Sequence, residues 1–129
     1  MPLVIRRADP RDLTAVTFFV DTCLRNDYFF RTGHLQAMLA SARHRVSLII
    51  LDDALVGLAI TTRPATLVNL LIHPAYRGLG IGTTVLKHVN PSAVRCKTDM
   101  STGDPGRFYA KNAFRPRARP TRIRRLTRR

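Results

Sequence analysis

The sequence predicts a single α/β (α+β) domain in which helices flank a central mixed β-sheet. Segments with apolar residues at helical spacing alternate along the chain with short, β-rich apolar runs. A glycine-rich loop separates one of these runs from a following helical segment. At 129 residues, 45% of them hydrophobic, the chain has the length of one domain and enough apolar residues for one core.

The first third of the chain predicts one strand followed by two helices. Leu3 to Ala8 is a short β-rich run, and Asp9-Pro10 is typical of a helix start, with an N-cap and then proline. The first helix extends to about Asn26, because apolar residues recur at helical spacing, namely Leu13, Val16, Val20 and Leu24. After a break from Asn26 to Gly33, a second helix is expected to bury Leu35, Met38, Leu39 and Ala42.

The middle of the chain predicts three strands. Val46 to Leu51 and Leu55 to Thr61 are apolar runs joined at Asp52-Asp53, a pattern that indicates a hairpin. Arg63-Pro64 follows, and Thr66 to Ile72 is almost continuously apolar, which is typical of a central strand.

The last third predicts a helix, a strand and a short helix. Beyond the glycine loop, apolar residues at helical spacing continue until Asn90-Pro91 stops the helix. Ala93 to Met100 is the strand, and Asp104-Pro105 starts a helix that reaches about Asn112. The order is β-α-α-β-β-β-α-β-α. We place the domain at 1–114 and an arginine-rich tail at 115–129, in which a further short strand near 121–126 is left open.

Positive charge dominates the composition. Twenty-two lysines and arginines face eight acidic residues, all aspartate, so the net charge is +14. The tail contributes eight of these positive charges, from Arg115, Arg117, Arg119, Arg122, Arg124, Arg125, Arg128 and Arg129. Such an excess favours polyanionic partners, nucleic acid first, because basic side chains neutralise phosphates and release counterions. A solvated tail produced by a coding bias is the alternative.

The glycine loop has the composition of a phosphate-binding site. Gly78, Gly80 and Gly82 follow Arg77, between a predicted strand and a predicted helix. Glycines let the main chain approach a ligand closely, and amides at a helix start favour negative charge. A dinucleotide-binding loop is the competing interpretation, but that loop normally opens the first βα unit of a chain.

Two motifs resemble those of the GCN5-related N-acetyltransferases, the GNAT family. His73-Pro74-Ala75-Tyr76-Arg77-Gly78-Leu79-Gly80-Ile81-Gly82 is similar to the family's acetyl-CoA signature, and Phe108 to Phe114 is similar to its second motif. The resemblance covers residues 3–114 and implies acetyl-CoA or another acyl-CoA as donor. It implies donor contacts from Leu71, Ile72, Arg77, Gly78, Leu79, Gly80, Ile81, Gly82 and Thr83.

Two departures from the family pattern stand out. Ala113 occupies the position where the family usually has glycine. The sequence also shows no clear pair of closing strands, so part of the substrate wall is expected to be missing. A homodimer, in which a second copy supplies that wall, is one arrangement that the sequence allows.

The resemblance assigns Tyr109 as the acid that protonates the departing thiolate. A thiol and a phenol have reference pKa values of about 8.5 and 10, so a well-placed tyrosine can do this. Packing of the last helix against the sheet is the alternative role. A backbone N–H near Leu71 or Ile72 would polarise the thioester carbonyl.

The general base is harder to assign, because the chain has no glutamate. Asp99 is the first candidate, with a purely local backbone contact as its alternative. Asn69 could orient water, and His73 is interpreted as a loop residue. The histidines at 34, 44 and 88 lack metal-ligand spacing, so we expect no metal.

An acceptor amine on a nucleobase would lessen the need for a base, because conjugation with the ring keeps it neutral. A narrower resemblance points the same way: Asp99, Gly103, Gly106 and Tyr109 are similar to residues of phage Mom-type DNA-modification proteins, which have a related fold and modify adenine. The aromatic residues of the break, Tyr28, Phe29 and Phe30, could stack on such a base. A core aromatic plug is their alternative role.

Three functions remain open from the sequence. The first is an N-acyltransferase whose acceptor is a nucleobase, or a protein or small-molecule amine. The second is an inactive domain of the same fold that binds CoA or nucleic acid, and the third is a basic structural protein. Without an apolar leader or a membrane-length run, and with Cys23 and Cys96 far apart, we expect a cytoplasmic protein.

Overall fold

The computed structural model describes residues 3–23, 34–63, 65–97, 106–112, 114–116 and 123–128. A seven-stranded sheet forms its centre, in the order β1-β2-β3-β4-β5-β7-β6. Neighbouring strands are antiparallel except β4 and β5, which run parallel. The strands are β1 (Leu3–Arg7), β2 (His44–Leu51), β3 (Ala54–Thr62), β4 (Thr66–Ile72), β5 (Ala93–Lys97), β6 (Phe114–Pro116) and β7 (Ile123–Arg128).

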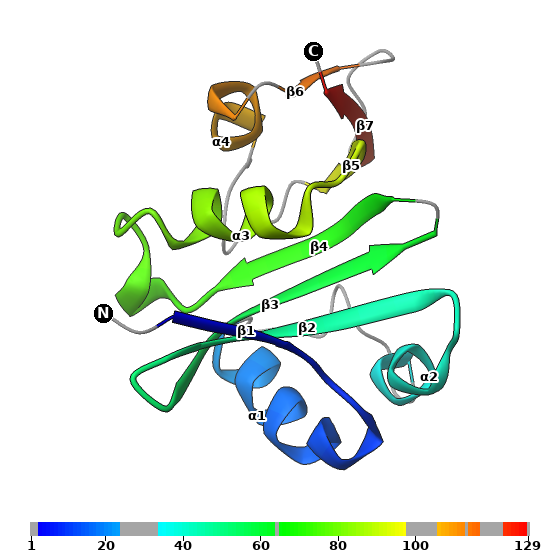
Figure 1. Cartoon of the computed structure of the whole chain (residues 1–129), viewed down its shortest axis with the longest axis vertical. Helices are drawn as coiled ribbons and strands as arrows, with labels where there is room; N and C mark the ends of the chain where they lie inside the picture. Colours follow the sequence, from blue (N-terminus) through cyan, green and yellow to red (C-terminus); the bar gives the residue numbers. More distant parts are fainter. Residues whose placement is uncertain are drawn as a thin grey trace.

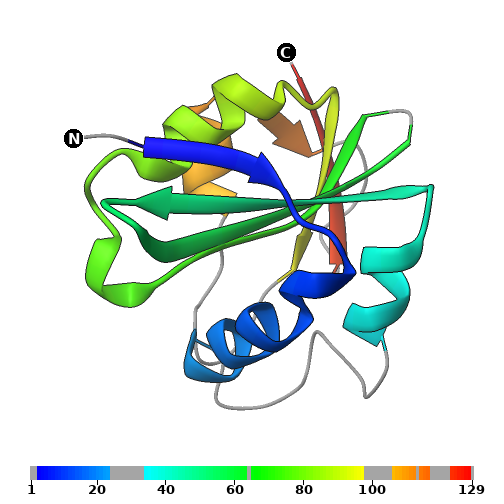
Figure 2. The same ribbon diagram turned by 60° about the horizontal axis from the view of Figure 1, so that its bottom comes forward.

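Helices cover both faces of the sheet (Figures 1 and 2). A 3₁₀ turn η1 (Pro10–Asp12) leads into α1 (Leu13–Cys23), which lies with α2 (His34–Ala40) on one face. A second 3₁₀ turn η2 (Pro74–Tyr76) precedes α3 (Ile81–Val89), which lies with α4 (Gly106–Lys111) on the other face. None of the described helices is both long and apolar enough to cross a membrane.

Each face has its own apolar core. On the first face, Val16 and Phe19 of α1 pack on Val46 and Leu58 of the sheet. On the second, Ile81, Val85, Leu86 and Tyr109 of α3 and α4 form a cluster with the strand residues Ile49, Val56, Ala59 and Leu67. Because side chains alternate along a strand, one apolar strand contributes to both cores, as the continuous apolar character of the central strand predicts.

The predicted order of elements is confirmed, and several boundaries agree closely. The predicted hairpin turn is found at Asp52 and Asp53, whose φ values of 50° and 67° are those of a two-residue turn that favours right-twisted hairpins. β4 has the predicted bounds. Asn90 ends α3 in the left-handed conformation, with φ 53°, and its amide donates to the carbonyl of Leu86.

The second helix is shorter than predicted. It ends at Ala40, so Ala42 does not lie on its buried side but is exposed in the turn before β2. The hydroxyl of Ser41 accepts a hydrogen bond from the amide of Arg43 and contacts the ring of His44 at 3.1 Å. Such local side-chain bonds compete with the helical pattern. The expected end of the first helix, near Asn26, and that of the 93–100 strand lie outside the described residues.

The expectation that closing strands are missing was wrong. β7 pairs with every residue of β5, and β6 pairs with β7, which completes the sheet beyond β5. Within β6, Phe114 is 2% exposed. The argument for a second copy that supplies this wall therefore no longer applies.

Candidate functional site

In the described parts of the two strands, the parallel neighbours β4 and β5 pair only where they begin. The two pairs are Thr66 with Ala93 and Leu67 with Val94. One residue further, β4 contains a bulge: Thr61 of β3 pairs with Leu67 and Ile60 pairs with Asn69, so Val68 is an extra residue. Among the described residues, positions 69–72 pair with β3 alone, and Val68 pairs with neither strand. We call the other side of this segment the unpaired edge of β4.

The register shows which amides lie on that edge. The amide of His73 donates to the carbonyl of Val56 at 2.8 Å. Since bonded and non-bonded pairs alternate along an antiparallel ladder, Leu71 bonds to β3, and the N–H groups of Leu70 and Ile72 point to the unpaired edge. The carbonyl of Ile72 agrees with this assignment, because it accepts from Arg77 Nε at 3.1 Å. Of the two strand amides named from the sequence, only that of Ile72 points away from β3.

The glycine loop begins directly after β4 and the turn η2. Gly78 and Gly80 have φ values of 81° and 79°, which side chains other than glycine rarely adopt. A Cβ built at either position meets nothing within 4 Å. The two glycines are therefore required by the backbone conformation, and the space beside them is open to a ligand.

The start of α3 presents unused donors. The first helical bond runs from the amide of Thr84 to the carbonyl of Gly80, at 3.1 Å. In the described part of the chain, the amides of Ile81, Gly82 and Thr83 donate to no protein acceptor. The N-cap residue is Gly80, which has no side chain that could accept a hydrogen bond from these amides. Free amides combined with the helix dipole favour an anion.

Gly82 has a different reason to be glycine. A Cβ there would lie 2.9 Å from Cζ of Phe108 in α4. The first turn of α3 is thus in close contact with α4, the helix that carries Tyr109. Phe108 is the first residue of the second motif, but the sequence did not single it out as a residue of the site.

Tyr109 is 5% exposed and belongs to the core under α3. Its ring lies edge-on to Phe108 and Phe114, with centroid distances of 5.1 Å and 6.2 Å. The ring therefore packs α4 against the sheet. Packing by the ring and chemistry by the hydroxyl are compatible, and they can be separated by substitution.

His73 lies at the junction of β4 and the loop. Its Nδ1 accepts from the amide of Ala75 at 3.1 Å, and its ring packs edge-on against Tyr76 at 5.8 Å. A neutral imidazole that accepts through Nδ1 carries its proton on Nε2, which then cannot receive another. This geometry makes His73 a cap of the 3₁₀ turn, as the interpretation of a loop residue implies.

Of the remaining predicted site residues, the structure describes Asn69 but not Asp99 or the three aromatic residues. Asn69 lies in β4 opposite Ile60, which belongs to the core under α1 and α2, so the two share that face. Asp99 and the aromatic residues Tyr28, Phe29 and Phe30 lie outside the described residues. Among the described residues, no three His, Cys, Asp or Glu side chains are grouped as metal ligands.

Comparison with known families identifies the relatives of this arrangement. The family model described as "Acetyltransferase (GNAT) domain" matches residues 42–116, which is more than half of the chain. This chain belongs to the GNAT acetyltransferase family. The match includes β4, the glycine loop, α3 and α4, so the two motifs that resemble the family lie within it. A search of curated protein sequences found no significant match.

Solved structures share the GNAT fold over nearly the whole length. An acetyltransferase from Thermus thermophilus has a TM-score of 0.76 at 17% identity, covering 99% of this chain and 97% of the other. A GNAT acetyltransferase from Staphylococcus aureus has a TM-score of 0.72 at 17% identity, with 98% of each chain covered. The PaiA N-acetyltransferase of Thermoplasma acidophilum, solved with coenzyme A, has a TM-score of 0.68 at 16% identity, with 99% of each covered.

The family assignment makes the protein a GNAT-type acyltransferase, and acetyl-CoA fits as its acyl donor. The residues of the glycine loop fit such a donor. It offers three free amides, two glycines with open space beside them and the exposed Arg77, which suits a diphosphate. The adjoining unpaired edge of β4 presents the further amides of Leu70 and Ile72.

Proposed function

We propose that the protein transfers an acyl group from acetyl-CoA to an amine of a nucleobase in DNA or RNA. The observation that carries the donor half of the proposal is the group of free amides at Ile81, Gly82 and Thr83, beside the open space at Gly78 and Gly80. The net charge of +14 supports the acceptor half.

Acetyl-CoA, when bound, supplies an acetyl group activated as a thioester. The amides of the loop, with Arg77, would hold its diphosphate. The amide of Ile72 would donate to a carbonyl oxygen at the unpaired edge of β4 and stabilise negative charge that develops there. These donors are backbone groups of a paired strand and a helix, so they are held in position before any ligand arrives.

Tyr109 is the proposed proton donor to the departing thiolate. Two features support this role: the tyrosine matches the second motif, and the contact between Gly82 and Phe108 keeps α4 next to the loop. The buried ring has little freedom to move, which would hold its hydroxyl in a fixed position.

The choice of acceptor rests on the shortage of bases. An alkyl amine, with a pKa of about 10.4, must lose a proton before it attacks. The chain has no glutamate, and His73 uses its Nδ1 lone pair on Ala75. A nucleobase amine is neutral already, so the demand on Asp99, the remaining proposed base, is smaller. The same shortage favours the second candidate, an inactive domain that binds CoA or nucleic acid.

The test measures release of CoA thiol by the purified protein with DNA, RNA, a polyamine or a lysine peptide as acceptor. Mass spectrometry of nucleosides from the same reactions then identifies an acylated base. We expect release with nucleic acid and its loss in Tyr109→Phe, while Tyr76→Phe, a matched change in the turn beside the loop, keeps it. Release with the polyamine or peptide alone would disprove the nucleobase acceptor, and no release with any acceptor would favour the inactive domain.

A further inference from the structure

A cavity of about 350 Å³ lies well away from the glycine loop. Its lining comes from the end of β1, the start of β2, the end of β3 and the last turn of α3. The loop, in contrast, follows the far end of β4 and precedes the first turn of α3. A seven-residue strand is about 20 Å long and a nine-residue helix about 13 Å, so the two places are separate.

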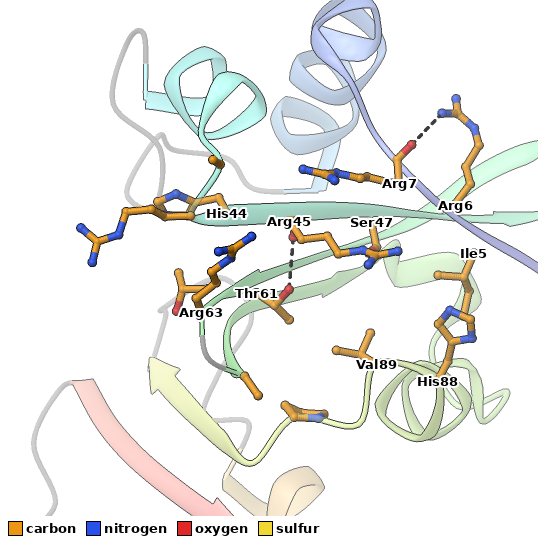
Figure 3. A pocket seen from close by; sticks show the side chains of 15 residues that line it. Ile5, Arg6, Arg7, His44, Arg45, Ser47, Thr61, Arg63, His88 and Val89 are labelled. Carbon is orange, nitrogen blue, oxygen red and sulfur yellow. Dashed lines mark hydrogen bonds between the residues drawn. The ribbon is translucent and has the colours of Figure 1, made fainter.

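Strand pairing brings basic side chains from distant parts of the sequence into this cavity. Arg7 of β1 pairs with Ser47 of β2, and Arg45, two residues earlier in β2, pairs with Thr61 of β3. Alternation puts Arg7 and Arg45 on the same face of the sheet. Arg63 follows β3, where its amide donates to the carbonyl of Arg43 at 3.2 Å. Figure 3 shows these arginines around the cavity, with His88 of α3 also in its lining.

The lining is strongly positive and holds no compensating acid. It contains five arginines and two histidines but no aspartate. One of the five, Arg6, is already paired with Asp12 at 2.9 Å. In the described part of the chain, the guanidinium groups of Arg7, Arg45 and Arg63 make no ion pair and no hydrogen bond. Like charges that line one cavity repel each other, and an anion bound among them would remove that cost.

We infer that this cavity is a second anion site, distinct from the donor site, that binds a phosphate group. Guanidinium groups match the oxygens of a phosphate in shape and can bind two of them at once. The volume admits one phosphate and part of the molecule that carries it. The phosphate can belong to the backbone of a nucleic acid or to a small phosphorylated molecule. The inference does not depend on which acceptor the enzyme uses.

The test compares two double variants that each remove two positive charges. Arg45→Gln/Arg63→Gln changes the cavity, and Lys87→Gln/Lys111→Gln changes exposed lysines of α3 and α4 outside it. Binding of inorganic phosphate is measured by calorimetry, and binding of a short labelled DNA duplex by fluorescence anisotropy over a range of salt. Acetyl-CoA binding, expected to be unchanged in both variants, shows that each is folded and that the donor site is intact.

We expect the cavity variant to lose roughly tenfold or more in affinity, as for lost charge-assisted hydrogen bonds, and the lysine variant to lose clearly less. A loss for DNA, with a salt slope shallower by about 0.9 for each phosphate contact removed, identifies a nucleic-acid backbone as the source. A loss confined to inorganic phosphate identifies a small phosphorylated ligand. Equal losses in the two variants, or no binding of either probe, would overturn the inference.

Discussion

Gly82 of α3 lies directly against the ring of Phe108 in α4, where a Cβ would come within 2.9 Å of Cζ and 3.1 Å of Cε1. The helix that follows the donor loop and the helix that carries Tyr109 are therefore in contact at a single glycine. This contact explains why a helical position, with no need for a left-handed backbone, is still glycine.

We expect Gly82→Ala to destabilise the protein by about 1–3 kcal/mol, since an added methyl group must displace the Phe108 ring. Phe108→Leu in the same chain should restore part of the loss, because a smaller side chain admits the methyl group. Chemical denaturation of the four proteins of this double-mutant cycle measures the coupling. Additive losses would show that the two residues do not interact.

Gly80→Asp and Gly80→Ala separate backbone strain from charge. Both substitutions strain a backbone with φ 79°, at a cost of about 1–2 kcal/mol, but only aspartate adds a negative charge beside the free amides. We expect acetyl-CoA to bind at least tenfold more weakly to the aspartate variant than to the alanine variant, and Arg77→Ala to weaken binding as well. A ligand at 100 times its Kd adds about 2.7 kcal/mol of stability, so thermal shifts with acetyl-CoA can measure these differences. Wild-type affinity in the aspartate variant would contradict the loop assignment.

Tyr109→Phe tests the hydroxyl while it keeps the ring in the core. We expect kcat to fall by about 10²-fold or more, the range of general acid catalysis, while the packing of the ring is retained. Tyr109→Leu should in addition destabilise the fold, because the edge-on contacts with Phe108 and Phe114 are lost. Steady-state kinetics and thermal unfolding together make the distinction. If the phenylalanine variant keeps full activity, Tyr109 only packs.

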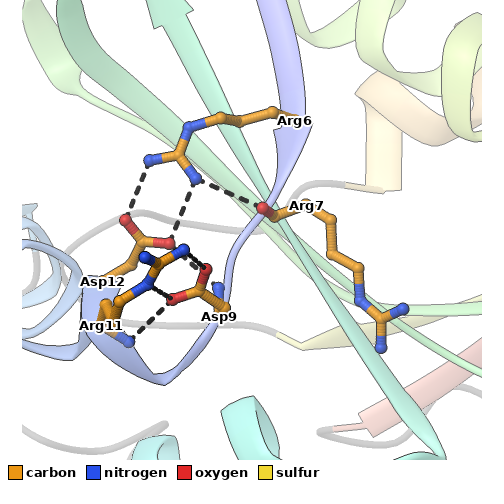
Figure 4. A network of polar contacts seen from close by, with 5 residues as sticks. All are labelled: Arg6, Arg7, Asp9, Arg11 and Asp12. Carbon is orange, nitrogen blue, oxygen red and sulfur yellow. Dashed lines mark hydrogen bonds and ion pairs between the residues drawn. The ribbon is translucent and has the colours of Figure 1, made fainter.

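Asp12 makes the stability of the fold depend on pH in the acid range, and a substitution can measure this contribution. Its carboxylate accepts two hydrogen bonds from Arg6, at 2.9 Å and 3.1 Å, and one from the amide of Asp9 at 2.9 Å (Figure 4). These bonds lower the pKa of Asp12 from 3.8 to about 2. Because the pKa is lower in the folded state, the stabilisation is complete above pH 3.8 and is lost as the pH falls towards 2.

The melting temperatures of wild type and Asp12→Asn should therefore differ most near neutral pH and converge in acid. Asp21→Asn is a suitable control, since among the described residues this exposed acid of α1 makes no ion pair. A difference that stays constant down to pH 2 would mean that the carboxylate charge of Asp12 contributes nothing.

Deletion of residues 117–129 should destabilise the sheet and not merely reduce the charge. The deletion removes β7, which pairs with all five residues of β5, and leaves β5 as an edge. Arg124→Gln/Arg125→Gln removes two charges but keeps the strand. We expect this variant to unfold near the wild-type temperature and the truncated chain well below it. Equal unfolding temperatures for the truncated and complete chains would contradict the strand pairing.

The sequence predicted the elements whose signal is local. β4 was placed at its observed bounds because its apolar run is continuous, and the end of α3 because Asn90-Pro91 both favours a left-handed cap and stops a helix. The sequence left open a short strand near 121–126, which β7 overlaps, but it did not predict the pairing of β6 with β7. Ile123 and Leu126 are three residues apart among arginines, so the alternation that indicates a strand is absent.

Features that depend on register were beyond the sequence. The bulge at Val68 and the early separation of β4 from β5 follow from the pairing of three strands. The basic cavity likewise joins Arg7, Arg45 and Arg63, which only the antiparallel order β1-β2-β3 brings together. Arginines at strand ends were the available signal, but nothing local indicated that their strands are neighbours.

The short pairing between β4 and β5 has a consequence for solvent exchange. Leu70 and Ile72 are interior positions of a seven-stranded sheet, yet among the described strands none lies beside their N–H groups to protect them. In deuterated water these two amides should exchange much faster than those of Leu71 or of β3. A bound molecule with amide carbonyls along its length would accept hydrogen bonds from these amides, as a neighbouring strand does, and would slow their exchange.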